Sequence, residues 1–457
     1  MPRQGVPWET QIRLDQPVLV FALIAAAVAT LGFGLFPALQ SARRDLVAGT
    51  NLTGRGSSGR RQTRIRGGLV VAQVALSIVL LLGAGVLMRT FVKLVGVDFG
   101  FDTRNLLVAG VAFPPRQNPT PADQLRFYRE AVDRVGSIPG VLSIAIANDP
   151  PPFGGMQSPL QIPGLAVPEQ ASAGVTFCNE RLFETIGLPI LRGRQITALD
   201  VERSHHVAIV NESFVKKYFE ASDPLGRTIR LTRLATLPVP VADPTFQIVG
   251  VARDIPNQGP RDLPMPQAFV PFTLRGPAGL GFVMRMSGDP MSIVTALRRE
   301  IQAVDRQVAI VDPSSLESVI QRVFYARPRF SLLILGIFAC TGIVLVAFGV
   351  YGVLAYTVSQ QAKEIAIRVA LGGARSDVIG MVLRMGLTLT GAGLVVGLAI
   401  SAATNRLLVS QLWNTSPHDP MTLAVTVLLV CAIGLLACWM PARRALRVEP
   451  IVALRHE

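Results

Sequence analysis

Residues 360–377 read QQAKEIAIRVALGGARSD, and they lie between two long apolar runs at 330–356 and 378–404. Apolar side chains recur at helical spacing within this stretch. Glu364 precedes Arg368 by four residues, an order that stabilises a helix by about 0.2–0.5 kcal/mol. The basic residues of the stretch are Lys363, Arg368 and Arg375. The pattern predicts a short, basic, amphipathic helix held between two membrane spans.

The composition is that of a membrane protein with a sizeable soluble part. Of the 457 residues, 50% are hydrophobic and 16% charged, whereas about a quarter of the residues of a soluble domain are charged. The net charge of +14 would suggest a nucleic-acid or anionic-lipid partner for a soluble chain. Arginine concentrated in short cytoplasmic loops explains this charge more simply, so we expect no nucleic-acid partner.

The residues that usually carry chemistry form no convergent set. Cys178 is the one cysteine outside the apolar runs, and no Cys-x-x-Cys pair occurs. His205 and His206 are adjacent, so their side chains point apart and do not form a metal-binding face. The glycines at 54 and 59 are not followed by the Lys-Ser/Thr pair of a phosphate-binding loop. We therefore expect no catalytic residue, metal or cofactor, and do not interpret the chain as an enzyme.

Five apolar runs are long enough to cross a membrane, which requires about 20 residues. They are predicted as transmembrane helices at 17–39, 67–88, 330–356, 378–404 and 421–440. The first run could instead be a signal peptide, but its basic residues follow it and no cleavage site is evident, which favours a span. The fourth run contains GLTLTGAGLVVG (386–397), whose small residues allow close helix packing.

The region at 89–328 alternates short strands with helices and predicts an α+β domain. Helices are predicted at 120–138, 212–219 and 292–304. Strands are predicted at 141–147, 175–179, 207–210, 246–251 and 268–271, with a loop at 150–155.

Arginine distribution predicts the orientation, because short cytoplasmic loops carry the excess of Lys and Arg. The short basic segments are the linker at 40–66, the stretch at 357–377 and the tail at 441–457. Five spans place all three in the cytoplasm only if residues 1–16 and the domain at 89–328 lie outside the cytoplasm.

A repeated pattern suggests an internal duplication. Phe36-Pro37-Ala38 and Met440-Pro441-Ala442 both leave an apolar run and lead into a basic segment. On this interpretation the first span ends a preceding unit, and the chain corresponds to the C-terminal part of a longer duplicated protein.

Several motifs together resemble the FtsX-like/MacB-type permeases of ABC transporters. KEIAIRVALGGARSDV (363–378) is similar to the cytoplasmic coupling segment of that family, and PARRALRVEPIVALR (441–455) to its C-terminal signature. The MacB-like periplasmic core domain is resembled by FETIGLPILRGRQIT (183–197), VAIVNESFVKKYF (207–219), DPLGRTI (223–229) and FQIVGVARDI (246–255). Ala366 departs from the family pattern E-I-G-I-R, which has Gly at that position.

This resemblance implies a five-helix membrane protein of the bacterial inner membrane with a MacB-like extracytoplasmic core domain at 89–328 and an FtsX-like permease domain at 329–457. It implies that the spans dimerise or pair with a sister half, and that a separate cytoplasmic ATPase drives movement of the external domain for export, efflux or mechanotransmission. The residues implied to contact that ATPase are Lys363, Glu364, Ile365, Ala366, Arg368, Leu371, Gly372 and Arg375. The alternative is a scaffold or signalling protein that acts on a cell-envelope partner without transport. The sequence does not name the cargo.

Overall fold

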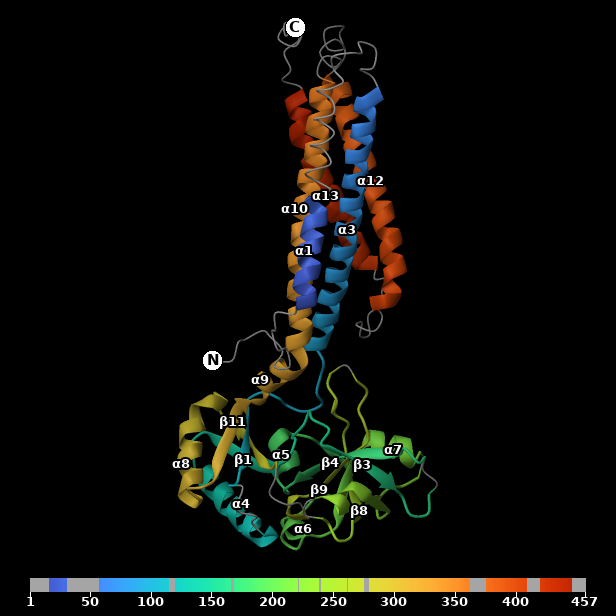
Figure 1. The fold of residues 1–457 in the computed structure, drawn as a ribbon. Coiled ribbons are helices and arrows are strands. Elements are labelled where there is room, and N and C mark those ends of the chain that lie inside the picture. Colours follow the sequence, from blue (N-terminus) through green and yellow to red (C-terminus); the bar gives the residue numbers. More distant parts are fainter. Residues whose placement is uncertain are drawn as a thin grey trace. The chain divides into compact units, whose positions relative to one another are not determined.

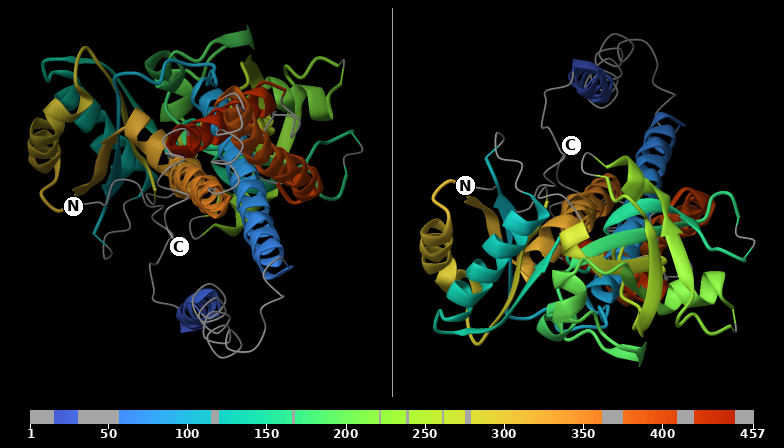
Figure 2. Two further views of the ribbon diagram at one scale, coloured as in Figure 1. Left: turned by 90° about the horizontal axis from the view of Figure 1, so that it is seen from above. Right: turned by 90° about the horizontal axis from the view of Figure 1, so that it is seen from below.

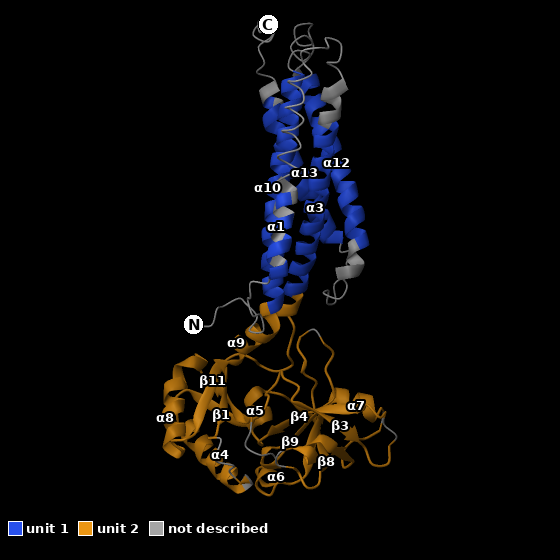
Figure 3. Cartoon of the chain, viewed as in Figure 1, with its two compact units in different colours: residues 1–92, 327–457 blue, residues 93–326 orange. Residues whose placement is uncertain are grey.

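The computed structural model describes residues 16–30, 57–114, 120–165, 168–220, 222–237, 240–260, 262–274, 279–361, 375–408 and 420–445. The chain divides into two compact units (Figure 3). The first, residues 1–92 and 327–457, is named the membrane unit. The second, residues 93–326, is named the external unit after its expected position outside the cytoplasm.

The membrane unit is helical. Its helices are α1 (Gln16–Thr30), α3 (Ser57–Val95), α10 (Ala326–Gln360), α12 (Arg375–Leu408) and α13 (Pro420–Ala445). Within the described residues, four helices are long and apolar enough to cross a membrane: Arg64–Val95, Leu316–Gln360, Ser376–Ala403 and Pro420–Pro441. The predicted count of five is not confirmed, because α1 is shorter than a span and residues 31–39 lie outside the described residues.

Glycines bring α3 and α10 into close contact, with the two helices running in opposite directions. A Cβ on Gly349 of α10 would lie 2.7 Å from Oε1 of Gln73, and one on Gly342 would lie 2.8 Å from Oγ of Ser77. Higher residue numbers on α10 thus face lower numbers on α3. Small residues allow such backbone approach, which maximises van der Waals contact between helices in lipid.

The helix α12 packs parallel to α3 and antiparallel to α13. A Cβ on Gly393 would lie 2.5 Å from Cβ of Val74, and one on Gly397 would lie 2.9 Å from Cβ of Ile78. On α13, a Cβ on Gly434 would lie 2.9 Å from Oγ1 of Thr390. The prediction that the small residues at 386–397 permit close packing is confirmed. These directions bring the start of α3, the end of α10, the start of α12 and the end of α13 to one end of the bundle (Figure 1).

The external unit contains two lobes built on one continuous run of paired strands. The sheet lobe is an antiparallel sheet with the order β11-β1-β10-β2. Its strands are β1 (Leu106–Ala112), β2 (Val141–Ala147), β10 (Gly281–Met286) and β11 (Ala309–Ser315). Its helices are α4 (Pro121–Gly136), α8 (Val294–Val304) and α9 (Leu316–Ile320), with the 3-10 turn η4 (Pro290–Ile293) and the π-helical turn η5 (Gln321–Tyr325).

The barrel lobe, residues 149–274, is inserted between β2 and β10. Its strands pair in the order β4-β3-β7-β8-β6-β9, and β9 pairs with β4 to close a six-stranded barrel. They are β3 (Met156–Gln161), β4 (Ser172–Cys178), β6 (Val207–Asn211), β7 (Thr228–Leu231), β8 (Thr245–Ala252) and β9 (Gln267–Pro271), and β5 (Ile190–Gly193) pairs with β8. Its helical segments are α5 (Leu182–Ile186), α6 (Ala198–Glu202), α7 (Glu212–Tyr218), η2 (Thr232–Thr236) and η3 (Phe272–Leu274). The two lobes lie side by side in Figures 1 and 2.

The lobes share one hydrophobic core but few strand contacts. Between β2 and β4 a single residue pair, Ala147 and Cys178, is in register. Tyr128 of α4 packs edge-to-face on Phe272 of η3, with 5.5 Å between ring centroids. Burial raises the pKa of the Cys178 thiol, first through desolvation and then through Glu180, so this cysteine is an unreactive core residue.

The local predictions for the external unit are largely confirmed. The predicted strand at 141–147 is β2 with the same bounds, and the strands predicted at 175–179, 207–210, 246–251 and 268–271 are β4, β6, β8 and β9. The helix predicted at 120–138 is α4, which begins in a capping box formed by Thr120 and Asp123. The helices predicted at 212–219 and 292–304 are α7 and η4 followed by α8. The loop predicted at 150–155 contains no helix or strand and ends immediately before β3.

Candidate functional site

The predicted coupling residues lie almost entirely in residues 362–374, outside the described residues. This applies to Lys363, Glu364, Ile365, Ala366, Arg368, Leu371 and Gly372. Arg375 is the first residue of α12, and its side chain is also outside the described residues. The structure therefore describes the two helix ends that hold the segment: α10, which ends at Gln360, and α12, which begins at Arg375.

These two helix ends are packed together. Val378 in the first turn of α12 is buried against Val358 in the last turn of α10 and against Met381. Thr357 is buried and donates from Oγ1 to the carbonyl of Val353 at 2.8 Å. The chain between 361 and 375 therefore leaves from and returns to one packed pair of helices.

A cation–π contact attaches α3 to the same end of the bundle. The guanidinium carbon of Arg66 lies 4.1 Å from the ring centroid of Tyr356. Nε2 of Gln360 donates to the hydroxyl oxygen of Tyr356 at 3.3 Å. Arg64 on α3, Arg384 on α12 and Arg443 on α13 are exposed. Since the start of α3, the start of α12 and the end of α13 share one end of the bundle, positive charge gathers there.

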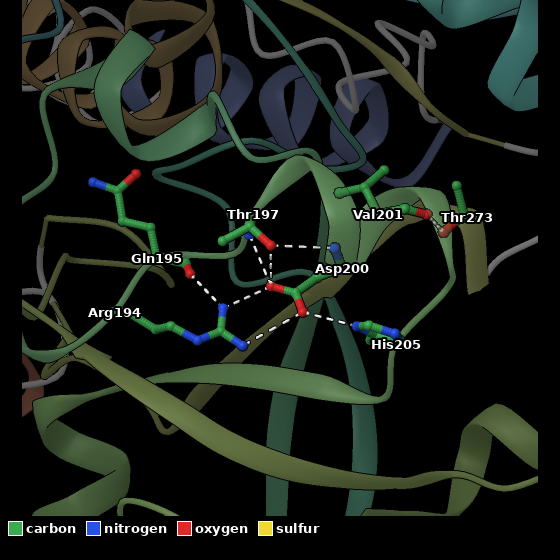
Figure 4. A network of polar contacts seen from close by, with 7 residues as sticks. All are labelled: Arg194, Gln195, Thr197, Asp200, Val201, His205 and Thr273. Atoms are coloured by element: carbon green, nitrogen blue, oxygen red, sulfur yellow. Dashed lines mark hydrogen bonds and ion pairs between the residues drawn. The ribbon is translucent and has the colours of Figure 1, made fainter.

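The external unit holds a buried carboxylate, Asp200, in a network of polar contacts (Figure 4). Its Oδ2 accepts from Nη1 of Arg194 at 2.6 Å, and from the Oγ1 and backbone N–H of Thr197 at 2.8 and 2.9 Å. Its Oδ1 lies 3.1 Å from Nδ1 of His205. Burial would raise the pKa of Asp200, but the hydrogen bonds from Arg194, Thr197 and His205 outweigh it and hold the pKa below its ordinary value.

This network has a structural role: it stabilises the N-terminus of α6. The Thr197–Asp200 pair is a capping box, readable in the sequence as Thr-x-x-Asp, although we did not predict it. Oγ1 of Thr273 donates to the carbonyl of Val201 at 2.8 Å and fixes the helix to η3. Among the described residues, no group of three or more His, Cys, Asp or Glu could hold a metal ion.

The adjacent histidines contact different partners. His205 faces Asp200, whereas Nδ1 of His206 lies 3.3 Å from the carbonyl of Thr245 and its ring stacks on Phe246 at 5.4 Å. Both are half-buried immediately before β6, and the predicted divergence of the two rings is confirmed.

Two family models match the chain. The MacB-like periplasmic core domain matches residues 68–317, and the FtsX-like permease C-terminal domain matches residues 336–450. The chain belongs to the FtsX/MacB-type permease family of ABC transporters. The resemblance inferred from the sequence motifs is thereby confirmed.

Curated members of this family match the chain at low identity. The macrolide export ATP-binding/permease protein MacB of Hahella chejuensis is 24% identical over 295 residues, which cover 63% of this chain and 43% of that protein. The pyoverdine export ATP-binding/permease protein PvdT of Pseudomonas aeruginosa is 25% identical over 283 residues, which cover 60% of this chain and 41% of that protein. The matches thus span less than half the length of these relatives.

A solved structure also shows similarity to the chain. The crystal structure of the periplasmic region of MacB from Actinobacillus actinomycetemcomitans has a TM-score of 0.34 and 14% sequence identity, and covers 50% of this chain and 97% of that chain. The names of the curated relatives join an ATP-binding part to a permease, whereas both domains matched in this chain are permease parts.

Proposed function

We propose that this chain is a permease subunit that couples ATP hydrolysis by a separate cytoplasmic ATPase to movement of the external unit, in the inner membrane of a bacterium. The observation that supports it most is the packed pair of helix ends at Val358 and Val378, which flanks the segment similar to the coupling segment of the family. A push on residues 362–374 would be transmitted into α10 and α12 together, because Val358 and Val378 pack against each other.

The proposed orientation places the basic end of the bundle in the cytoplasm. Arg64, Arg66 and Arg443 lie at this end, as short cytoplasmic segments with excess Lys and Arg require. The segment 362–374 joins α10 to α12 at the same end, so it meets a cytoplasmic ATPase. The external unit is joined to α3 and α10 at their opposite ends and is proposed to lie outside the cytoplasm.

The coupling residues are proposed to divide into a charged and an apolar set. Glu364 and Arg368 are four residues apart on the predicted helix and would pair with charged groups of the ATPase. Ile365, Leu371 and Gly372 would form apolar contacts with the same ATPase. Ala366 replaces a glycine of the family pattern, and its methyl group would limit how closely the ATPase can approach the segment.

A second permease half is part of this proposal, either another copy of the chain or a sister half. On α10, Cβ atoms at Gly336 and Gly352 would meet nothing within 4 Å, and the same holds for Gly391 on α12. These positions leave room for the close approach of a further helix. The cargo and any cell-envelope partner of the external unit are not specified by these contacts.

Co-isolation tests the proposal. The tagged chain is purified from its native membranes with and without Glu364→Lys, and with Glu169→Lys in the external unit as a control of the same charge change. We expect the wild type and Glu169→Lys to co-purify with an ATPase and to function in the cell. Glu364→Lys is expected to lose both the bound ATPase and function. If no ATPase is retained and Glu364→Lys is without effect, the alternative of a non-transporting scaffold or signalling protein is favoured.

A further inference from the structure

The π-helical turn η5, Gln321–Tyr325, lies between α9 and α10, where the external unit ends. A π turn inserts a residue into the helical hydrogen-bond register, and such turns occur frequently at functional sites. This turn carries two consecutive aromatic residues, Phe324 and Tyr325, that contact different parts of the external unit.

Phe324 is packed between two loops of the barrel lobe. Its ring stacks on Phe153, with 5.7 Å between centroids and an interplanar angle of 23°. On another side it lies against Gly259, where a Cβ would be 2.9 Å from Cε1 of the ring. Gly259 has a φ of +122°, a conformation that residues with side chains rarely adopt. The glycine therefore provides both the backbone conformation and the space that the ring requires.

Tyr325 contacts the end of α3. Its hydroxyl donates to the carbonyl of Leu94 at 3.4 Å, and Leu94 is fully buried in the last turn of α3. The turn that precedes α10 thus contacts the end of α3 through Tyr325 and the barrel lobe through Phe324.

The loop that holds Gly259 is firmly tied to the barrel. Nδ2 of Asn257 donates to the carbonyl of Met265 at 2.9 Å, and the N–H of Met265 donates to Oδ1 of Asn257 at 2.8 Å. Asn257 is itself buried, and its Nδ2 also donates to Oε1 of Gln267, the first residue of β9, at 2.9 Å. Because Asn257 is bonded to the first residue of β9, a displacement of Gly259 would also displace that strand.

We propose that Phe324 is the residue through which movement of α10 displaces the barrel lobe, by its contacts with Phe153 and Gly259. This rests on the proposed function and adds the connection that carries the movement. The lobes share a hydrophobic core and α5 packs on β2 and β10, but between β2 and β4 only Ala147 and Cys178 are in register. This narrow strand connection is the place about which a force on the barrel loops would turn the barrel lobe. The hydrogen bond from Tyr325 to Leu94 would make the end of α3 move together with the turn.

Distance measurements within one chain test the proposal. Spin labels are placed at Leu263→Cys, 88% exposed in the barrel-lobe loop, and at Leu142→Cys, 65% exposed on β2, in a chain whose native cysteines are replaced. The permease is reconstituted with its ATPase in lipid nanodiscs, and the distance is measured without nucleotide and with ATP under conditions that block hydrolysis.

We expect ATP to shift the distance in the wild type, and Phe324→Ala to remove at least half of the shift while ATP hydrolysis remains within twofold. Phe324→Tyr keeps the ring and is expected to restore the shift. Val323→Ala, an exposed neighbour in the same turn, is expected to leave it unchanged. A full shift in Phe324→Ala would overturn the role of Phe324 but not the proposed function, whereas no shift in the wild type would overturn both.

A second measurement covers the case in which Phe324→Ala assembles poorly with the ATPase. Hydrogen exchange is compared in the full chain alone. Gly259→Ala, which forces the ring away, is expected to increase exchange at residues 255–266 and 150–155 at least tenfold. Gly226→Ala, also at positive φ but with nothing within 4 Å of its Cβ, is expected to leave both loops unchanged. Equal effects of the two substitutions would contradict the proposal.

Discussion

Arg66 of α3 lies over the ring of Tyr356 of α10, with 4.1 Å between the guanidinium carbon and the ring centroid. This contact fastens the first described turns of α3 four residues before α10 ends at Gln360. Together with the packing of Val378 on Val358, it holds α3, α10 and α12 together near the point where the proposed coupling segment begins.

Loss of this cation–π contact should destabilise the membrane unit. We expect Arg66→Gln to lower the free energy of unfolding of the membrane unit by about 0.5–2 kcal/mol. The stability of Arg66→Lys should lie between those of the wild type and Arg66→Gln. Thermal unfolding in detergent measures the effect. Phe348→Leu on the exposed face of α10 is the control and should change stability little. An unchanged transition in Arg66→Gln would show that the contact contributes nothing.

Two glycines of α12 should respond oppositely to alanine. A Cβ on Gly386 would collide with Sγ of Cys438 and lie 3.2 Å from Cδ1 of Leu354, whereas one on Gly391 would meet nothing within 4 Å. We expect Gly386→Ala to cost about 1–3 kcal/mol through overpacking, and Gly391→Ala to be neutral or to stabilise by up to about 1 kcal/mol. Thermal unfolding in nanodiscs compares the two variants, and similar destabilisation by both would contradict the described packing.

The hydroxyl of Tyr128 is fully buried and has no hydrogen-bond partner among the described residues. We therefore expect Tyr128→Phe to leave the stability of the external unit unchanged or to raise it by about 1 kcal/mol. Tyr218→Phe is the matched comparison, because its hydroxyl donates to the carbonyl of Ser172 at 2.9 Å and accepts from the N–H of Ser172. That variant should lose about 1 kcal/mol. Denaturant unfolding distinguishes the two, and a larger loss in Tyr128→Phe would contradict this account.

The stabilisation from Asp200 should depend on pH. Its folded-state pKa is lowered, because hydrogen bonds from Arg194, Thr197 and His205 outweigh burial. The contribution is therefore fully present above the ordinary carboxyl pKa of about 4, and is lost as the pH falls below that value toward the folded-state pKa.

We expect Asp200→Asn to cost about 1–3 kcal/mol at pH 7, and the difference from the wild type to shrink below about pH 4. Unfolding monitored by hydrogen exchange in α6 measures it. Asp223→Asn, in an exposed ion pair with Arg192, should cost at most about 1 kcal/mol. If the difference in unfolding free energy between the wild type and Asp200→Asn stayed constant below pH 4, the lowered pKa of Asp200 would be contradicted.

Local structure in the external unit followed from local sequence. The strand at 141–147 is a short, mostly apolar run, and the helix after Thr120 carries its own capping residues, so both were predicted with nearly the observed bounds. Closure of the barrel depends on parallel pairing of Gly174 with Gln267. That contact joins segments far apart in the chain, and no local pattern specifies it.

The membrane unit shows the same division between local and non-local information. The length of the apolar runs predicted the four spans that the structure describes. The local sequence does not show that Gly386 faces Cys438 whereas a Cβ on Gly391 would meet nothing within 4 Å. The aromatic contacts of Phe324 could not be predicted, because Phe153 and Gly259 approach it only through the tertiary fold. The coupling residues themselves remain a prediction.

Crosslinking at Ala366 tests whether residues 362–374 contact a cytoplasmic ATPase. A cysteine is introduced by Ala366→Cys in a chain whose native cysteines are replaced, and by Met421→Cys, an exposed position at the opposite end of the bundle. Native membranes are treated with a short bifunctional reagent that links the thiol to lysine. We expect Ala366→Cys to form a covalent adduct with an ATPase and Met421→Cys to form none. An adduct with periplasmic protein from Ala366→Cys, or with the ATPase from Met421→Cys, would contradict this expectation.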